Sequence, residues 1–163
     1  MQGDEIRVNL GGGAYTSPSG EEWSADRAYA RGGFGCLDMA LTDTLGTDDD
    51  IEGTEDDPLF RTIRVGEMFR YRFDVSPGKY AVRLLFAEIY WESSDAEMQD
   101  VYINGRRVIR DFNIFDEAGH DRYLCREFST SVGDGGLEVK FVGMSLPMHH
   151  GARACAIEVK GKG

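Results

Sequence analysis

The sequence predicts an all-β protein whose strands form an antiparallel β-sandwich. Segments with an apolar side chain at every second position recur along the chain, which is the period of a strand that buries one face. Turn signals rich in Gly, Asn and Pro separate these segments at short spacing, and no segment shows a convincing helical pattern. About eight short strands of this kind are typical of a sandwich.

The N-terminal third contains one clear strand followed by a long polar segment. Ile6, Val8 and Leu10 alternate with polar residues and predict a first strand. This strand ends at the glycine run 11–13, which gives a tight turn the backbone freedom it needs. Segment 14–57 is rich in Gly, Ser, Thr and Asp and has little periodicity. We expect it to carry binding function or to be partly disordered.

From residue 60 onward the strand signal continues almost to the end of the chain. Val101 and Ile103 lead into Asn104-Gly105, a strong signal for a two-residue hairpin, and the chain returns over 107–109. The other predicted strands cover residues 60–65, 68–75, 80–91, 123–132, 137–141 and 155–159.

Length and charge narrow the domain organisation and the partners. A chain of 163 residues fits a single domain, residues 1–163, which is long enough to bury a sizeable core. The formal net charge of −11 argues against nucleic acid and anionic membrane surfaces, because phosphates attract basic faces. No apolar run approaches the roughly 20 residues that span a bilayer, so no membrane insertion is expected.

Cysteine and histidine do not form a recognisable metal site. The spacings of Cys36, Cys125 and Cys155 match no zinc pattern. Cys155 fits a buried apolar position on a strand, and a disulfide between the other two cysteines stays open. His149 and His150 would point apart on a strand and have no third ligand nearby, so no metal site is predicted.

The chain has 29 Asp and Glu residues, so two carboxylates can occur near each other in the sequence by chance. The acidic run 48–57 offers the oxygen ligands of a structural calcium ion, but it lacks the order of a calcium loop. A solvated loop is the favoured interpretation, and no cofactor is expected. Glu88 with Asp95 or Asp116 would supply a glycosidase pair, a pairing that chance alone explains in this composition. No Gly-x-Ser-x-Gly occurs, and no catalytic residue is predicted.

The strand 80–91 ends in a cluster suited to a sugar. Adjacent residues of a strand point to opposite faces, so Tyr90 and Trp91 cannot both enter one core. The polar residues that follow indicate that at least one ring lies near solvent. A ring can stack on the C–H face of a pyranose, and Glu88 can accept from its hydroxyls. The alternative is that both rings cap the edge of the core.

Several motifs in order resemble the malectin family. The matching segments span most of the chain and comprise Ile6-Arg7-Val8-Asn9-Leu10-Gly11-Gly12, Phe86-Ala87-Glu88-Ile89-Tyr90-Trp91, Asp100-Val101-Tyr102-Ile103-Asn104-Gly105, Asn113-Ile114-Phe115-Asp116 and the closing segment 154–161. The resemblance implies one non-catalytic domain with its core over about 6–161. It also implies a jelly-roll-like, galactose-binding-domain-like sandwich whose long loops at one end bind carbohydrate, glucose disaccharides in the founding member.

The resemblance also implies which residues would contact the sugar. The family's adjacent aromatic pair falls on Tyr90 and Trp91, and a loop tyrosine falls on Phe34 by a looser alignment. A third ring falls near Val65, where this chain has none, and an aspartate falls near His150. The expected carbohydrate-binding residues are Tyr90, Trp91, Phe34, Glu88 and His150.

The expected ligand is a neutral, glucose-containing oligosaccharide bound weakly, with Kd of roughly 10 μM to 1 mM, or about −7 to −4 kcal/mol. The alternative is a protein-interaction or assembly module that has lost sugar binding, which the absent ring and aspartate favour. Similar domains are appended to glycoside hydrolases and receptors, so a larger protein and its protein partners are expected. Family members mostly face the secretory lumen, cell exterior or periplasm; the cytoplasm stays open.

Overall fold

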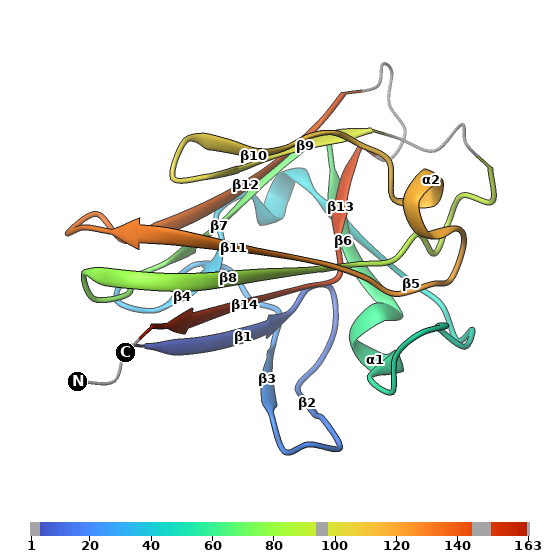
Figure 1. Ribbon diagram of the computed structural model, residues 1–163, viewed down its shortest axis with the longest axis horizontal. Coiled ribbons are helices and arrows are strands. Elements are labelled where there is room, and N and C mark those ends of the chain that lie inside the picture. The colour runs from blue at the N-terminus through green and yellow to red at the C-terminus, as the bar shows by residue number, and fades with distance from the viewer. Residues whose placement is uncertain (1–3, 94–97, 145–150, 163) are drawn as a thin grey trace.

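The computed structural model describes residues 4–93, 98–144 and 151–162 and forms two sheets packed face to face (Figure 1). The order of the six-stranded sheet is β11 (Leu124–Val132), β8 (Gly78–Phe86), β14 (Ala156–Gly161), β1 (Glu5–Asn9), β3 (Glu22–Ala25) and β2 (Tyr15–Thr16). The order of the five-stranded sheet is β10 (Arg106–Phe112), β9 (Gln99–Ile103), β12 (Leu137–Gly143), β7 (Met68–Phe73) and β4 (Phe34–Cys36). Every strand pair in these sheets except β1–β3 is antiparallel, which confirms the predicted sandwich.

The alternating apolar residues that predict the strands form the inner face of the sandwich. In β7 the residues Phe69, Tyr71 and Phe73 are fully buried and alternate with half-buried polar residues. They share one core with inward-facing residues of β8 and β12, and the rings of Phe69 and Phe141 stack at 4.7 Å. Burial of this apolar face is the main stabilising contribution to the domain.

The Asn104-Gly105 turn joins β9 to β10 as predicted. Both residues have positive φ, 47° and 80°, the conformation of a type I′ turn, which asparagine and glycine adopt most easily. The β9–β10 pairing runs from Arg106 opposite Ile103 along the hairpin, with two register shifts further on.

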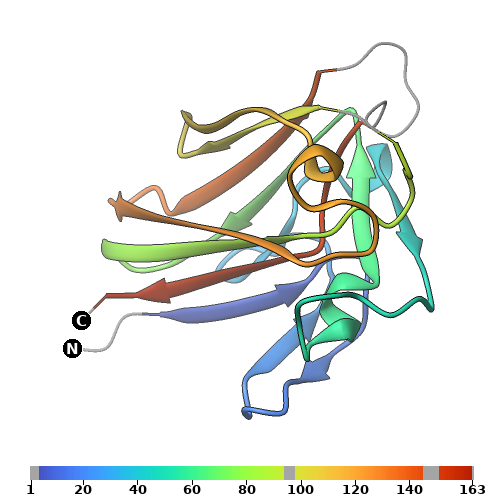
Figure 2. The same ribbon diagram turned by 45° about the vertical axis from the view of Figure 1, so that its right-hand side comes forward.

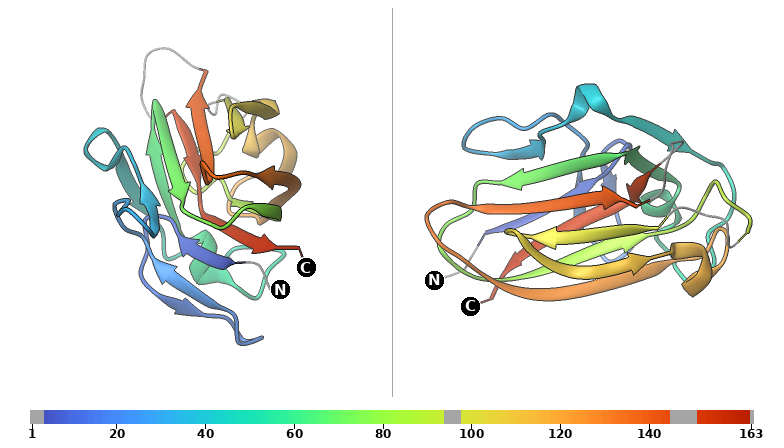
Figure 3. Two further views of the ribbon diagram at one scale, coloured as in Figure 1. Left: turned by 90° about the vertical axis from the view of Figure 1, so that its left-hand side faces the viewer. Right: turned by 90° about the horizontal axis from the view of Figure 1, so that it is seen from above.

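A third sheet and two short helices cover one end of the sandwich. The three-stranded sheet has the order β13 (Ala152–Ala154), β6 (Thr62–Gly66) and β5 (Asp43–Gly46). The helices α1 (Asp57–Phe60) and α2 (Ile114–Ala118) lie at the same end, and both described chain ends lie at the other (Figures 2 and 3). No helix in the described part of the chain is long and apolar enough to cross a membrane.

Segment 14–57 is more regular than its sequence predicts. It contains β2, β3, β4, β5 and a 3₁₀ turn at Met39–Leu41, each two to four residues long. Elements this short show no periodicity, because their hydrogen-bond partners come from distant strands such as β1, β6 and β7. Helix α2 is also missing from the prediction; Asn113 caps it by accepting from the Asp116 backbone N–H at 3.0 Å.

The three cysteines are free thiols, so the open possibility of a disulfide is excluded here. Cys155 is fully buried, as expected of a small apolar residue, and burial strongly raises the pKa of its thiol. Cys36 lies in the main core, and Cys125 packs at the edge of a second cluster around Trp23, Phe60 and Leu85.

Candidate functional site

The aromatic pair leaves the sheet at the end of β8. The strand ends at Phe86, five residues before the end of the predicted strand, and the buried residues Ala87 and Ile89 continue into the second apolar cluster. Tyr90 is 49% exposed. Its ring lies 4.9 Å from the Trp91 ring at an interplanar angle of 83°. About half of the Tyr90 surface is therefore accessible to a ligand, and the Trp91 ring packs against Tyr90 at a steep angle.

Glu88 anchors this pair from below. Its side chain is 1% exposed, and its Oε2 accepts from Arg153 Nη1 at 2.8 Å. The same oxygen accepts from the backbone N–H groups of Tyr90 and Trp91, both at 3.1 Å. The expectation that Glu88 accepts from sugar hydroxyls therefore needs correction: a buried oxygen that already has three donors positions the rings and does not face solvent.

Arg153 is a buried partner of Glu88 that the sequence analysis misses. It is 1% exposed at the centre of β13, and its backbone is held by Gln99, whose Nε2 donates to the Arg153 carbonyl at 3.0 Å. The Arg153 backbone N–H donates to Gln99 Oε1 at 3.1 Å. The available signal is a single arginine within the small apolar run 152–157, where a charged side chain requires a buried partner.

A groove lies over the third sheet at this end of the sandwich. It has a volume of about 600 Å³ and is lined by residues of β5, β6 and the segment before β5, together with Gly151. Asp43, Val65 and Arg153 are register partners across β5, β6 and β13, which places the groove and the aromatic pair at the same end of the sandwich. Position 65 is an aliphatic valine that is 4% exposed, so this chain offers no ring there.

Phe34 does not join the aromatic pair. It lies opposite Phe73 on β7, and Phe73 in turn lies opposite Leu137. The end of β12 nearer the candidate site is Gly143, paired with Gln99, so Phe34 occupies the opposite end of the sandwich. The Phe34 ring stacks on Phe73 at 6.2 Å and under the Arg27 guanidinium. The looser alignment placed it wrongly, and His150 lies outside the described residues.

Three titratable side chains, Asp49, His120 and Asp121, lie close together near the Trp91 backbone. His120 Nδ1 lies 2.8 Å from the Trp91 carbonyl, which can only accept, so Nδ1 carries the proton. Its Nε2 lies 3.3 Å from Asp121 Oδ2. Asp49, His120 and Asp121 bring their polar atoms within 4.8 Å of one another. Burial, followed by the neighbouring Asp49, raises the pKa of Asp121 to about 6.

The raised pKa of Asp121 predicts a pH-dependent stability. The folded protein holds this proton more tightly than the unfolded chain, so the contribution of Asp121 to the free energy of unfolding falls as the pH rises from about 4 to about 6. The fall should be about 1–3 kcal/mol. Asp121→Asn has no such proton to lose and should flatten this part of the profile. Urea unfolding at several pH values measures it, and parallel profiles for both proteins would contradict the assignment.

The fold and the half-exposed Tyr90 at its end are those of a lectin-like β-sandwich domain. The Malectin domain model matches residues 5–161. Mouse malectin is 32% identical over 136 residues, which cover 82% of this chain and 45% of the mouse protein. The chain belongs to the malectin family of carbohydrate-binding domains, and it spans about 30–45% of the length of the malectins it matches.

Solved structures show the same fold inside larger proteins. Bacteroides uniformis β-glucuronidase matches with a TM-score of 0.84 and 26% identity over 98% of this chain and 18% of the enzyme. The plant receptor-like kinase FER matches with a TM-score of 0.77 and 22% identity over 98% of this chain and 42% of the receptor chain. The second likeness, at its low identity, concerns the fold alone.

Proposed function

We propose that this domain is a non-catalytic module that recognises a neutral, glucose-containing oligosaccharide at the end of the sandwich that carries Tyr90 and Trp91. The observation that supports it most is the half-exposed Tyr90 ring, held beside Trp91 by a buried carboxylate. Aromatic rings fixed in this way can stack on a pyranose without losing much conformational entropy on binding.

The groove at the same end of the sandwich as the aromatic pair would supply polar partners for the sugar. Thr42, Asp43 and Glu67 line it together with Val65 and Gly151. Carboxylate and hydroxyl oxygens accept from sugar hydroxyls, and these residues replace the buried Glu88 in that role. One half-exposed ring and a groove support weak binding, with Kd of roughly 10 μM to 1 mM.

A glycan array is the experiment that tests this function. We expect a hit among neutral gluco-oligosaccharides and loss of that hit in Trp91→Ala, with the far-ultraviolet circular dichroism unchanged. Phe34→Leu is the matched control: it alters a ring at the opposite end of the sandwich and should leave binding unchanged. Equal binding by Trp91→Ala would contradict the site, and an array without hits would favour a protein-interaction module.

We propose that sugar binding needs no metal ion. The described side chains with metal-ligating spacing, Asp49, His120 and Asp121, offer two carboxylates and one imidazole behind Trp91. Calcium prefers six to eight oxygen ligands, which this group does not supply. Titration of a sugar with and without EDTA should give the same Kd. A loss of affinity with EDTA that calcium restores would contradict the proposal.

A further inference from the structure

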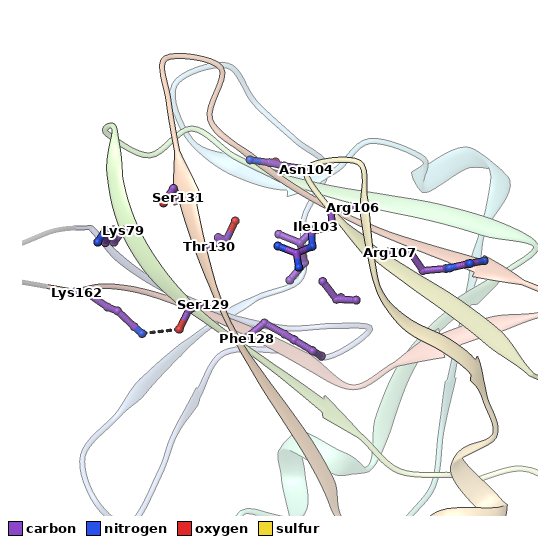
Figure 4. Close-up of a pocket in the computed structure, with 11 residues that line it drawn as sticks. Lys79, Ile103, Asn104, Arg106, Arg107, Phe128, Ser129, Thr130, Ser131 and Lys162 are labelled. Carbon is purple, nitrogen blue, oxygen red and sulfur yellow. Dashed lines mark hydrogen bonds between the residues drawn. The ribbon is translucent and has the colours of Figure 1, made fainter.

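A second groove lies along the side of the sandwich between the edges of its two sheets. It has a volume of about 870 Å³ and runs between the β9–β10 hairpin and strand β11 (Figure 4). Strands β10 and β11 are the outermost strands of their sheets. The groove is separate from the candidate sugar site, because it opens near the Asn104-Gly105 turn and not near the end of β8.

Basic side chains cluster along this groove, although the chain as a whole is acidic. Four basic side chains line it, Lys79, Arg106, Arg107 and Lys162, although the chain has 29 acidic and 18 basic residues. Within the described residues, Arg107 is the one member with a carboxylate partner, Asp100 at 3.3 Å. Lys162 donates to the Ser129 hydroxyl (Figure 4). Like charges brought together without counter-charges repel one another, and an anionic ligand would relieve this repulsion.

The wall of the groove also supplies backbone hydrogen-bonding groups, on the outer edge of β11. Strand β11 is nine residues long and pairs with β8 without interruption, from Leu124 opposite Phe86 to Val132 opposite Gly78. No other described strand pairs with its outer edge. Alternate N–H and C=O groups on that edge are therefore open to an added strand. Phe128 is half-buried there and gives an apolar contact for a side chain of the added strand.

The opposite edge is unsuited to strand addition. The β9–β10 pairing shifts register twice, between Arg107 and Ile109 and again before Phe112. Asp111 has φ of 49°, which turns the backbone away from a regular strand. Bulges and arginine side chains at an edge prevent pairing with another strand. The two edges thus differ. The β11 edge can form backbone hydrogen bonds with an added strand, and the β10 edge carries basic side chains.

We propose that this groove binds an acidic, extended segment of a protein partner, which adds as a strand to the outer edge of β11. The carboxylates of the segment meet Arg106, Arg107, Lys79 and Lys162, and its apolar side chains face Phe128 and Val108. Main-chain hydrogen bonds supply affinity in this mode of recognition, and the alternating side chains supply specificity. Nucleic acid is disfavoured by the net charge of −11.

The test uses a fluorescent peptide of alternating glutamate and valine and measures its anisotropy against the whole chain. The peptide should bind and should lower hydrogen exchange along β11. A peptide of alternating glutamate and proline keeps the charge but cannot donate at every second residue, so it should bind at least about tenfold more weakly. Equal binding of the proline peptide, a polyuronate or polyphosphate would reduce the groove to a non-specific charged surface and overturn the proposal.

A pair of charge reversals locates the contact. Arg106→Glu should weaken the glutamate–valine peptide by about tenfold or more. Arg31→Glu makes the same change of charge at an exposed arginine that does not line the groove, and it should alter binding less than about twofold. Both side chains are exposed, so both variants should fold. Equal loss in the two variants, or no binding of the peptide by the unaltered chain, would contradict the proposal.

Discussion

Glu88→Ala should lower the free energy of unfolding by about 3–5 kcal/mol, the largest loss that we expect from a single carboxylate in this domain. The change leaves the Arg153 guanidinium buried at 1% exposure without its counter-charge. Its Nε and Nη2 find no acceptor among the described residues, so no other described group can take over the charge. Denaturant unfolding followed by circular dichroism measures the loss.

A matched surface variant and a double variant separate the causes. Glu52→Ala removes a carboxylate that is 74% exposed and paired with Arg122, and it should change stability by less than about 1 kcal/mol. The double variant Glu88→Leu with Arg153→Met replaces the buried ion pair by apolar groups and should recover most of the lost stability. An unchanged stability in Glu88→Ala would show that the pair does not hold this end of the fold.

The double variant should still bind sugar poorly. Leucine at position 88 cannot accept from the backbone N–H groups of Tyr90 and Trp91, so the segment that carries the rings loses its anchor. Stability and binding then respond differently to the same pair of changes. Recovery of both together would mean that Glu88 stabilises the fold without positioning the rings.

Tyr90→Ala should remove most of the sugar affinity, a loss of about tenfold or more, and leave the fold intact. Tyr90 is 49% exposed, so only about half of its surface is buried, and the expected loss of stability is about 1–2 kcal/mol, too small to unfold the domain. Base stacking on a single aromatic ring shows how large the effect of one ring on ligand binding can be, about 1–3 kcal/mol. Calorimetric titration of the array hit measures the loss.

The comparison for this variant is Tyr123, which is also about half-exposed, at 40%. Its ring packs edge-on against Phe60 at 5.4 Å. Tyr123→Leu keeps that apolar contact and should retain the affinity of the unaltered domain. A loss of affinity in both variants would point to a general disturbance of this end of the sandwich. Retained affinity in Tyr90→Ala would exclude stacking on this ring.

The sandwich could be predicted because its core-facing residues form a local pattern of alternation in the sequence. In β7 and β8 every second residue faces the core, so the alternation of Phe69, Tyr71 and Phe73 is readable without knowing their partners. The Asn104-Gly105 turn is equally local, since the conformation belongs to those two residues. The short strands of segment 14–57 show no such pattern, because their partners lie far along the chain.

The site could be predicted only in part, for a related reason. The exposed ring follows from alternation at the end of β8, and the structure has Tyr90 half-exposed. The burial of Glu88 depends on Arg153, which lies 65 residues away and reaches it through the third sheet. The misplacement of Phe34 is a matter of register, since its pairing with Phe73 fixes the end of the sandwich to which it belongs. Such long-range pairings cannot be read from neighbouring residues.

The most direct test of the central claim is a titration of the array hit followed by tryptophan fluorescence. The chain has two tryptophans, and Trp23 is buried at 2% exposure in the second apolar cluster, so Trp91 is the reporter next to the proposed ligand. The account predicts a saturable change that disappears in Trp91→Phe and persists in Trp23→Phe. Saturable binding whose fluorescence change survives in Trp91→Phe would place the sugar elsewhere and contradict the account.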